Sequence, residues 1–375
     1  MPDVVVIGGG ITGCAAAALL AEAGAQVTLY EREEIAAGAS GRNSGVLQHP
    51  MDPATVPLYE ASLQLYAGLE HGFAFPAEAS GLLVVGTDAA ALAADREAVA
   101  AEFPELAPEW LEGGDLQAAE PALAGDLCAY RLDTGRPVPP AAATRAWAER
   151  ARAAGADIVE RAHATVARRD GRVAGVIVLE AVAVGAAGLS AGRRAVAADA
   201  VVVAAGPWTP AALGSEAWRP VGPLWGVVAQ VRLAHPPRHS IEQAGVEMLT
   251  SPGAPDSLFS IVTAGGASAV GSTFTRDQPD AAAVAPVLLE RGTRYVPALR
   301  NAEIEHVRAC ARPVSVDGRP LLGPVPGLDG LHVISGHGPW GISLGPGSAQ
   351  AVVQGVLGEG AAIAPELAAA RFGAP

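Results

Sequence analysis

The sequence predicts an α/β protein in which short buried strands alternate with helices, and three observations support this fold class. The chain of 375 residues is 50% hydrophobic and 17% charged, so it can form a large core and is not disordered. β-Branched runs that end in small residues recur at residues 4–7 and 200–205, as in strands buried on both faces of a parallel sheet. An Ala/Leu-rich helix is predicted over 14–24, directly after the first run. At roughly 150 residues per domain, the length indicates two or three domains.

The first unit is a strand, a glycine turn (GGGITG), a helix and a second strand that ends near Glu31. Gly8 permits the tight turn, Gly10 lets a pyrophosphate approach the backbone, and Gly13 lets helix and strand pack closely. The helix N-terminus presents free N–H groups to phosphates, and Glu31 is placed to accept ribose hydroxyls. This Rossmann-like unit predicts a dinucleotide site, although the stretch alone does not distinguish NAD from FAD.

A loop of small residues, GASGRNSG at 38–45, follows the second strand. Glycines and small side chains suit a backbone that passes closely over a large flat ring. Ser40 and Ser44 add hydroxyl donors, and Arg42 adds a fixed cation for a pyrophosphate. The loop therefore favours FAD; the alternative is an ordinary flexible Gly/Ser loop.

Later segments contribute to the same predicted site. The run at 200–205 ends in a Gly-Pro-Trp turn, and such strand ends are where open α/β sheets bind ligands. The turn GHGPWGISLGPG feeds a helix predicted over 348–357, and the N–H groups of Gly341 and Ile342 could face the N1–C2=O edge of a flavin. Val166 either offers its backbone to an adenine edge or belongs to the core. Residues 185–198 are expected to form a small extra loop.

Composition excludes several function classes. The formal charge of −14 argues against a nucleic-acid partner, which needs a basic face. All 25 cationic Lys/Arg residues are arginine, so no lysine can act as Schiff-base former, general base or oxygen-activating cation. Cys14, Cys128 and Cys310 form no CxxC pair, which favours a reducing cytoplasm and argues against a zinc site. No apolar run reaches 18 residues, so no membrane span is expected. No metal site is expected either.

The segments GGGITG, GASGRNSG, DAVVVAAGPW, ARPVSVDGRPLLGPV and SGHGPWGISLGPGS together resemble the D-amino-acid-oxidase superfamily of FAD enzymes. The glycine-oxidase, sarcosine-oxidase and D-amino-acid-dehydrogenase branches are the most similar. The resemblance implies FAD as cofactor and a discontinuous Rossmann-like FAD-binding domain over 1–75, 133–218 and 308–375. It also implies an inserted, mostly antiparallel substrate-binding domain over 76–132 and 219–307, where the resemblance is weaker.

The residues expected to bind FAD lie in these glycine-rich segments and in the strand near the adenine. They are Gly8, Gly10, Ile11, Thr12, Gly13, Glu31, Arg32, Ala39, Ser40, Arg42, Asn43, Ser44, Gly45, Val46, Val166, Ala205, Gly206, Gly338, Gly341, Ile342 and Ser343.

The resemblance also implies candidate catalytic residues. Arg312 matches the family arginine that binds the substrate carboxylate; the alternative is a structural salt bridge. His337 and Trp340 belong to the loop that borders the flavin, where His337 either donates to substrate or flavin or caps the loop. His49 either lines the cavity or is an ordinary polar loop residue. Cys310 is either a covalent link to the flavin or a small core residue.

By this resemblance the chain is expected to be an FAD-dependent amino-acid or amine oxidase or dehydrogenase. It would oxidise the Cα–N bond of an amino acid, or of an N-substituted or cyclic amino acid, by hydride transfer to flavin N5, giving an imine that water hydrolyses. Two alternatives stay open: a 2-hydroxy-acid dehydrogenase, and a flavoprotein subunit of a multi-chain dehydrogenase. The electron acceptor is O2 or another oxidant, and the sequence leaves the oligomeric state open.

Overall fold

The computed structural model describes residues 1–375 apart from 71, 184–188, 216, 246–255 and 361–362. The first strand lies near the middle of a six-stranded sheet with the order β18-β19-β12-β1-β2-β8. All neighbours in this sheet run parallel except β18, which is antiparallel to β19. The strands are β1 Asp3–Ile7, β2 Gln26–Tyr30, β8 Asp157–Val159, β12 Ala200–Val203, β18 Leu321–Pro324 and β19 Leu331–Ser335. The predicted α/β unit is therefore confirmed.

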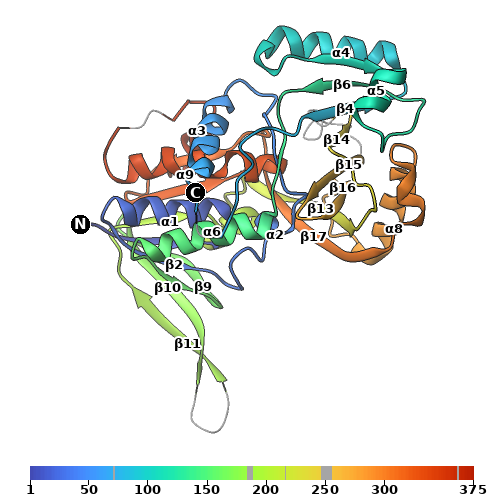
Figure 1. Cartoon of the computed structure of the whole chain (residues 1–375). Coiled ribbons are helices and arrows are strands. Elements are labelled where there is room, and N and C mark those ends of the chain that lie inside the picture. The colour runs from blue at the N-terminus through green and yellow to red at the C-terminus, as the bar shows by residue number, and fades with distance from the viewer. Residues whose placement is uncertain (71, 184–188, 216, 246–255, 361–362) are drawn as a thin grey trace.

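Both faces of this sheet are buried, because β1 carries apolar side chains at every position from Val4 to Ile7. Val4 and Val6 pack in one core with the helices of one face, whereas Val5 and Ile7 belong to the core on the other face. The helices that form the first layer lie together in Figure 1. They are α1 Ile11–Glu22, α3 Val56–Ala67, α6 Pro140–Ala153 and α9 Gly341–Val356.

A three-stranded antiparallel sheet covers the second face and extends away from the body of the molecule (Figure 1). Its strands are β9 Ala162–Arg169, β10 Arg172–Ala183 and β11 Leu189–Val196. The prediction of a small extra loop over 185–198 was wrong for 189–196, because β11 pairs with β10 from Leu189 to Val196, and 185–188 lie outside the described residues. The segment LSAGRRAV has little apolar alternation, so its strand conformation follows from pairing with β10.

The second large sheet has eight strands in the order β17-β13-β16-β15-β14-β4-β6-β5, and all its neighbours are antiparallel except β14 and β4. The strands are β4 Leu82–Gly86, β5 Glu109–Glu112, β6 Cys128–Leu132, β13 Val221–Val231, β14 Ser240–Gln243, β15 Ser257–Ala264, β16 Ala267–Thr273 and β17 Ile304–Ser315. All but β17 fall within 76–132 and 219–307, and β17 runs across residue 308. The exact domain boundaries stay a prediction.

Helix α9 begins seven residues before the predicted start at residue 348. The sequence Gly345-Pro346-Gly347 favours a turn by local propensity, but tertiary packing requires small residues here. A Cβ at Gly347 would lie 2.1 Å from the Leu58 carbonyl oxygen of α3, and one at Gly345 would lie 2.9 Å from Ile11 of α1. These glycines therefore allow three helices to approach closely.

Helices α4 Ala89–Glu102 and α8 Ala281–Gly292 pack against strands of the eight-stranded sheet. The remaining elements of the described residues are short: α2 Ala39–Arg42, α5 Gly113–Ala119, α7 Thr209–Ala212, β3 Val46–Leu47, β7 Arg136–Pro137 and the 3-10 turns Pro104–Leu106, Gly206–Trp208, Pro297–Asn301, Gly338–Trp340 and Ala369–Phe372. The three cysteines are buried and free. Within the described ranges, no helix is long and apolar enough to cross a membrane, and no His, Cys, Asp and Glu side chains cluster as a metal site would require.

Candidate functional site

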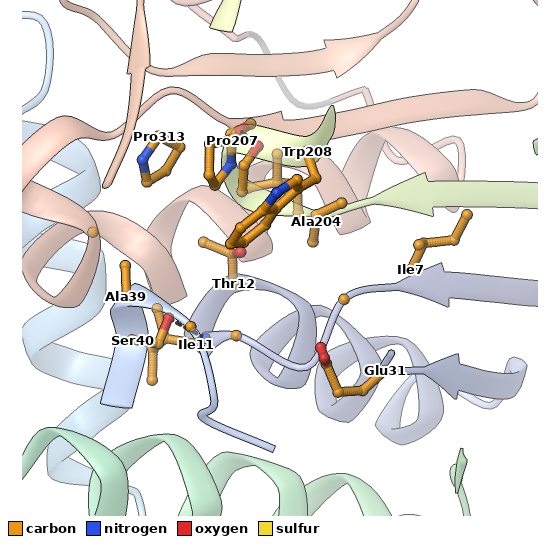
Figure 2. Close-up of a pocket in the computed structure, with 18 of the residues that line it drawn as sticks. Ile7, Ile11, Thr12, Glu31, Ala39, Ser40, Ala204, Pro207, Trp208 and Pro313 are labelled. Atoms are coloured by element: carbon orange, nitrogen blue, oxygen red, sulfur yellow. Dashed lines mark hydrogen bonds between the residues drawn. The ribbon is translucent and has the colours of Figure 1, made fainter. Parts of the chain in front are cut away.

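A cavity of about 1260 Å³, its open mouth included, lies where parallel strands β1, β2, β12 and β19 end. This is the edge at which open α/β sheets bind ligands. Sixteen predicted site residues line the cavity (Figure 2 shows some of them). They are Gly8, Gly10, Ile11, Thr12, Glu31, Arg32, Ala39, Ser40, Asn43, Ala205, Gly206, Arg312, His337, Gly338, Gly341 and Ile342.

The glycine turn is built for close backbone approach. Gly8 has a φ of +115°, and a Cβ there would lie 2.4 Å from the Ala204 carbonyl oxygen of the neighbouring strand end. A Cβ at Gly13, inside α1, would lie 1.9 Å from the Gly8 carbonyl oxygen. At Gly10, which lines the cavity, a Cβ would meet only Ser40, with Oγ at 3.0 Å. Gly8 and Gly13 are therefore needed by the fold, whereas Gly10 leaves space on the cavity side.

Polar groups at the turn are held in place by hydrogen bonds. Glu31 Oε2 accepts a hydrogen bond from the Gly9 N–H at 2.6 Å, and Glu31 Oε1 accepts one from the Glu33 N–H at 2.8 Å. Ser40 Oγ accepts the Ile11 N–H at 2.9 Å, the contact dashed in Figure 2. The acidic side chain predicted to face a ribose thus lies beside the turn predicted to face phosphates.

Pro207 and Trp208 line this cavity but were not among the predicted site residues. Pro207 and Trp208 extend over the cavity from the turn after β12 (Figure 2). The Arg32 guanidinium carbon lies 3.6 Å from the Trp208 ring centroid, so the two side chains stack as a cation–π pair. The Gly-Pro-Trp sequence signals a turn, but nothing local in it indicates the contact with Arg32.

The donor set and shape of this cavity fit FAD. The N-terminus of α1 and the glycine turn suit the pyrophosphate, and Glu31 suits a ribose. The 16-residue helix α9 begins at Gly341, also in the cavity wall, so its first free N–H groups and partial positive charge could stabilise the flavin edge that becomes negative on reduction.

A second cavity, of about 620 Å³, adjoins the first, and Asn43, Arg312, Pro339 and Ile342 line both. Predicted residues that line the second cavity but not the first are Ser44, Gly45, Val46, Trp340 and Ser343. Its remaining wall comes from Gln48, which follows β3, and from the eight-stranded sheet together with Phe274, which follows β16. These residues were missed by the sequence analysis: Gln48, Glu242, Leu258, Phe259, Ser260, Ser272 and Phe274.

Arg312, on β17, is a buried cation between the two cavities, with 7% of its surface exposed. Its guanidinium donates to the Thr273 carbonyl oxygen at 2.9 Å and to Ser272 Oγ at 2.5 Å, and it stacks 4.6 Å from the Phe274 ring centroid. Burial lowers the pKa of Arg312. No carboxylate of the described residues forms an ion pair with it, so its charge is available to an anionic ligand.

His337 lines the first cavity but is also fixed by the fold. Its Nε2 lies 3.0 Å from Ser348 Oγ of α9, and the residue forms a β-bridge with Val314. Burial lowers the pKa of His337 to about 4, so the ring is neutral at pH 7. The geometry supports the loop-capping alternative and leaves the donor role a prediction.

Several predicted residues lie outside the walls of both cavities. His49 is buried between Tyr59 and Phe103, with ring centroids 5.5 and 5.0 Å away. Arg42 Nη1 donates to the Ala309 carbonyl oxygen at 3.4 Å, and Val166 lies on β9, two residues beyond the cavity-lining Ala164.

Cys310 is a separate case, because the sequence left a covalent flavin link open. The residue is 4% exposed, pairs with Gly226 across β13 and β17, and lines neither cavity. Burial raises the pKa of its thiol, which disfavours the reactive thiolate. These observations favour the core role, and the covalent link stays an untested prediction.

His337, which is buried, and His332, which is partly buried, predict how stability changes with pH. Burial lowers the folded-state pKa values of His332 and His337 to about 4, against about 6.5 in an unfolded chain. Between these pH values the unfolded state binds protons that the folded state does not, so stability falls as pH falls from about 6.5 to 4. The expected loss is up to about 1.4 kcal/mol per pH unit for each histidine.

Urea unfolding at intervals from pH 7.5 to 4 would measure this loss. The variant His332→Gln, which changes no residue lining the two cavities, should flatten the pH dependence relative to the parent chain. Replacing the exposed His235 by glutamine serves as the control and should leave it unchanged. If the free energy of unfolding of His332→Gln and of the parent changes in parallel with pH, the assignment of a neutral ring to folded His332 is wrong.

Comparisons with known proteins extend this description. The family model DAO, described as FAD dependent oxidoreductase, matches residues 3–354. The chain is 26% identical over 373 residues to the glycine oxidase of Bacillus licheniformis, covering 95% of this chain and 93% of that protein. The crystal structure of glycine oxidase from Bacillus cereus ATCC 14579 superposes with a TM-score of 0.79 at 26% identity, covering 96% of each chain. Iminodiacetate oxidase from Chelativorans sp. BNC1 shares the fold, with a TM-score of 0.80 at 24% identity and coverage of 99% and 98%.

Proposed function

The chain belongs to the DAO family of FAD-dependent oxidoreductases, and from this premise we propose that it oxidises the Cα–N bond of a carboxylate-bearing amine. The substrate class is an amino acid or an N-substituted or cyclic amino acid. The observation that carries this proposal is the buried Arg312, whose guanidinium separates the two cavities and has no ion-pair partner among the described side chains.

The proposed reaction removes two electrons from the substrate. FAD, held by the residues that line the first cavity, would supply the acceptor for a hydride from the substrate Cα. The substrate nitrogen loses a proton in the same oxidation, so the C–N single bond becomes an imine. Water then adds to the imine carbon and gives an oxo acid. The nitrogen of an open-chain substrate leaves as ammonia or an amine, whereas a cyclic substrate opens its ring and keeps the nitrogen as an amino group.

In this scheme the residues of the chain bind and orient the substrate. Arg312 would donate two parallel hydrogen bonds to the substrate carboxylate, a geometry that suits a guanidinium fork. Ser272 and the Thr273 carbonyl hold the guanidinium from behind. Phe259 and Phe274 contribute apolar wall to the second cavity and help to exclude water from it. Fixing the carboxylate limits the orientations that Cα can take. Hydride transfer depends on this orientation, because the C–H bond must point at the acceptor.

The test is a flavin-bleaching screen of the purified holoprotein without oxygen. The donors are D- and L-amino acids, N-methyl amino acids, cyclic imino acids and 2-hydroxy acids. We expect at least one amino or imino acid to remove the absorbance of oxidised flavin, because Arg312 binds its carboxylate and its nitrogen can release a proton. Absorbance recorded after each addition measures the reduction rate.

Each other outcome of this screen contradicts the proposal. Bleaching by 2-hydroxy acids alone would replace amine oxidation with alcohol oxidation. Bound flavin that none of the donors bleaches would favour a subunit that receives electrons from a partner chain.

The rate at which the absorbance of oxidised flavin returns in air separates an oxidase from a dehydrogenase. The chain has no lysine, so fast return would require arginine or histidine to stabilise reduced oxygen.

We also propose that the enzyme is cytoplasmic. The three buried cysteines are all free thiols, as is usual in a reducing compartment.

A further inference from the structure

The second cavity, which we call the substrate cavity because Arg312 is proposed to bind the substrate there, adjoins a third cavity of about 720 Å³, its open mouth included. Gln48, Glu242 and Trp340 line both of these cavities and separate them, and we call these three residues the partition. Arg312 lines the first and second cavities but not the third. Arg312 therefore borders the side of the second cavity that adjoins the first, and the partition borders the side that adjoins the third.

The third cavity combines an apolar wall with negative charge. Among the described residues that line it, the charged ones are Asp95, Glu102 and Glu242, and none is an arginine or a histidine. Apolar side chains such as Met51 and Phe103 form much of the remaining wall. A cavity of this composition attracts a cationic group on an apolar stem and repels an anionic one.

Gln48 supplies an independent sign of a missing ligand. The residue is 5% exposed and held on both sides: its backbone N–H donates to Ser343 Oγ at 3.1 Å, and its side-chain Nε2 donates to Glu242 Oε2 at 3.0 Å. This second bond fixes which end of the amide is oxygen. The remaining atom, Gln48 Oε1, is buried and accepts no hydrogen bond from any described residue. A buried acceptor of this kind normally has a donor.

We propose that the partition binds a second, protonated nitrogen of the substrate, so that the preferred substrate is an amino acid with a cationic group on a long side chain or N-substituent. Gln48 Oε1 accepts an N–H of that group, and Glu242 supplies the opposite charge. The α-nitrogen lies one bond from the carbon that carries the carboxylate and stays near Arg312. A group at the far end of the cavity must therefore come from an extended substituent.

This inference rests on the proposed function for the identity of the carboxylate end. Its simplest competitor is that the Gln48–Glu242 hydrogen bond only joins β14 to the segment after β3. In that case neither residue contributes to the choice of ligand, and replacing them changes stability alone.

The test uses carboxylates that lack an α-amino group, so that binding is measured without amino-acid turnover. The probes 4-aminobutyrate, 6-aminohexanoate and 8-aminooctanoate are each compared with the unsubstituted fatty acid of the same length. Titrating the holoprotein and recording the flavin absorption spectrum gives a Kd for each. We expect an amino probe of at least one length to bind about 10- to 100-fold more tightly than its fatty acid, as for a charge-assisted hydrogen bond. Equal or weaker binding at all three lengths overturns the proposal.

Two variants and one control locate this preference. Glu242→Gln removes the charge, and Gln48→Leu removes the unpartnered oxygen, so each should reduce the amino-probe preference by about tenfold or more. Glu97→Gln removes an exposed carboxylate from α4, the helix that carries Asp95 and Glu102, at a position that does not line the cavity. This control should keep the parent preference. An unchanged preference in both partition variants overturns the proposal.

The two proposals fail differently. If neutral amino acids bleach the flavin as fast as lysine, ornithine or arginine, amine oxidation stands and the partition has no role in selection. If no amino acid bleaches it but the amino probes still bind preferentially, the partition stands as a cation-binding site and the reaction is wrong.

Discussion

Replacing Arg312 by leucine is expected to lower kcat/KM for the amino-acid substrate by about 10²- to 10⁴-fold. Removing one partner of a buried, hydrogen-bonded ion pair costs about 3–5 kcal/mol, and each 1.36 kcal/mol of transition-state stabilisation is a factor of ten in rate. Arg312→Lys keeps the charge but loses the two-pronged geometry, so its loss should be smaller. Steady-state kinetics with the best donor of the bleaching screen would measure both.

A structural role for Arg312 predicts a different pattern. Arg308→Leu is the matched control, because Arg308 lies on the same strand, is partly buried and lines neither cavity. That variant should keep nearly full activity. The decisive comparison is between the amino acid and the amine that lacks its carboxylate. Arg312→Leu should lose most of the preference for the amino acid while retaining bound flavin. An unchanged preference would show that another group binds the carboxylate.

Local sequence signals predicted the strand, glycine turn, helix and second strand that form one wall of the first cavity. The run of β-branched residues before the glycine turn, the helix after it and Glu31 at the end of the next strand are all close in sequence, so their arrangement follows from local rules. The start of α9 was missed, because Gly345 and Pro346 disfavour helix locally. Close packing against α1 and α3 outweighs that preference.

The wall of the second cavity was predicted less completely, because it is assembled from residues that are far apart in the sequence. Gln48 and Glu242 form a hydrogen bond although 194 residues separate them. Glu242 lies on β14, whose parallel pairing with β4 no local pattern reveals. Arg312 was found only because its surrounding sequence resembles that of a known family. The neutral amide of Gln48 has no sequence signature at all, and only its burial in the folded chain makes the oxygen significant.

Replacing Gly13 by alanine is expected to destabilise the protein and abolish FAD binding. The added Cβ would lie 1.9 Å from the Gly8 carbonyl oxygen, an atom of the backbone that cannot rotate away. The turn and α1 must separate, and we expect the free energy of unfolding to fall by about 3 kcal/mol or more. Urea unfolding of the apoprotein and titration with FAD, followed by quenching of flavin fluorescence, would measure the two effects.

Gly10 provides the contrast that separates cofactor binding from folding. A Cβ at this position meets only the Ser40 side chain, so Gly10→Ala should fold with a small cost. Its methyl group nevertheless occupies the wall that the pyrophosphate approaches, so FAD affinity should fall by about tenfold or more, or about 1.4 kcal/mol. Gly355→Ala is the control: it lies in α9 with no atom within 4 Å of the added Cβ and should stabilise the chain by up to about 1 kcal/mol. Wild-type stability of Gly13→Ala would contradict the requirement of the fold for Gly13, and wild-type FAD affinity of Gly10→Ala would contradict the role of Gly10 in FAD binding.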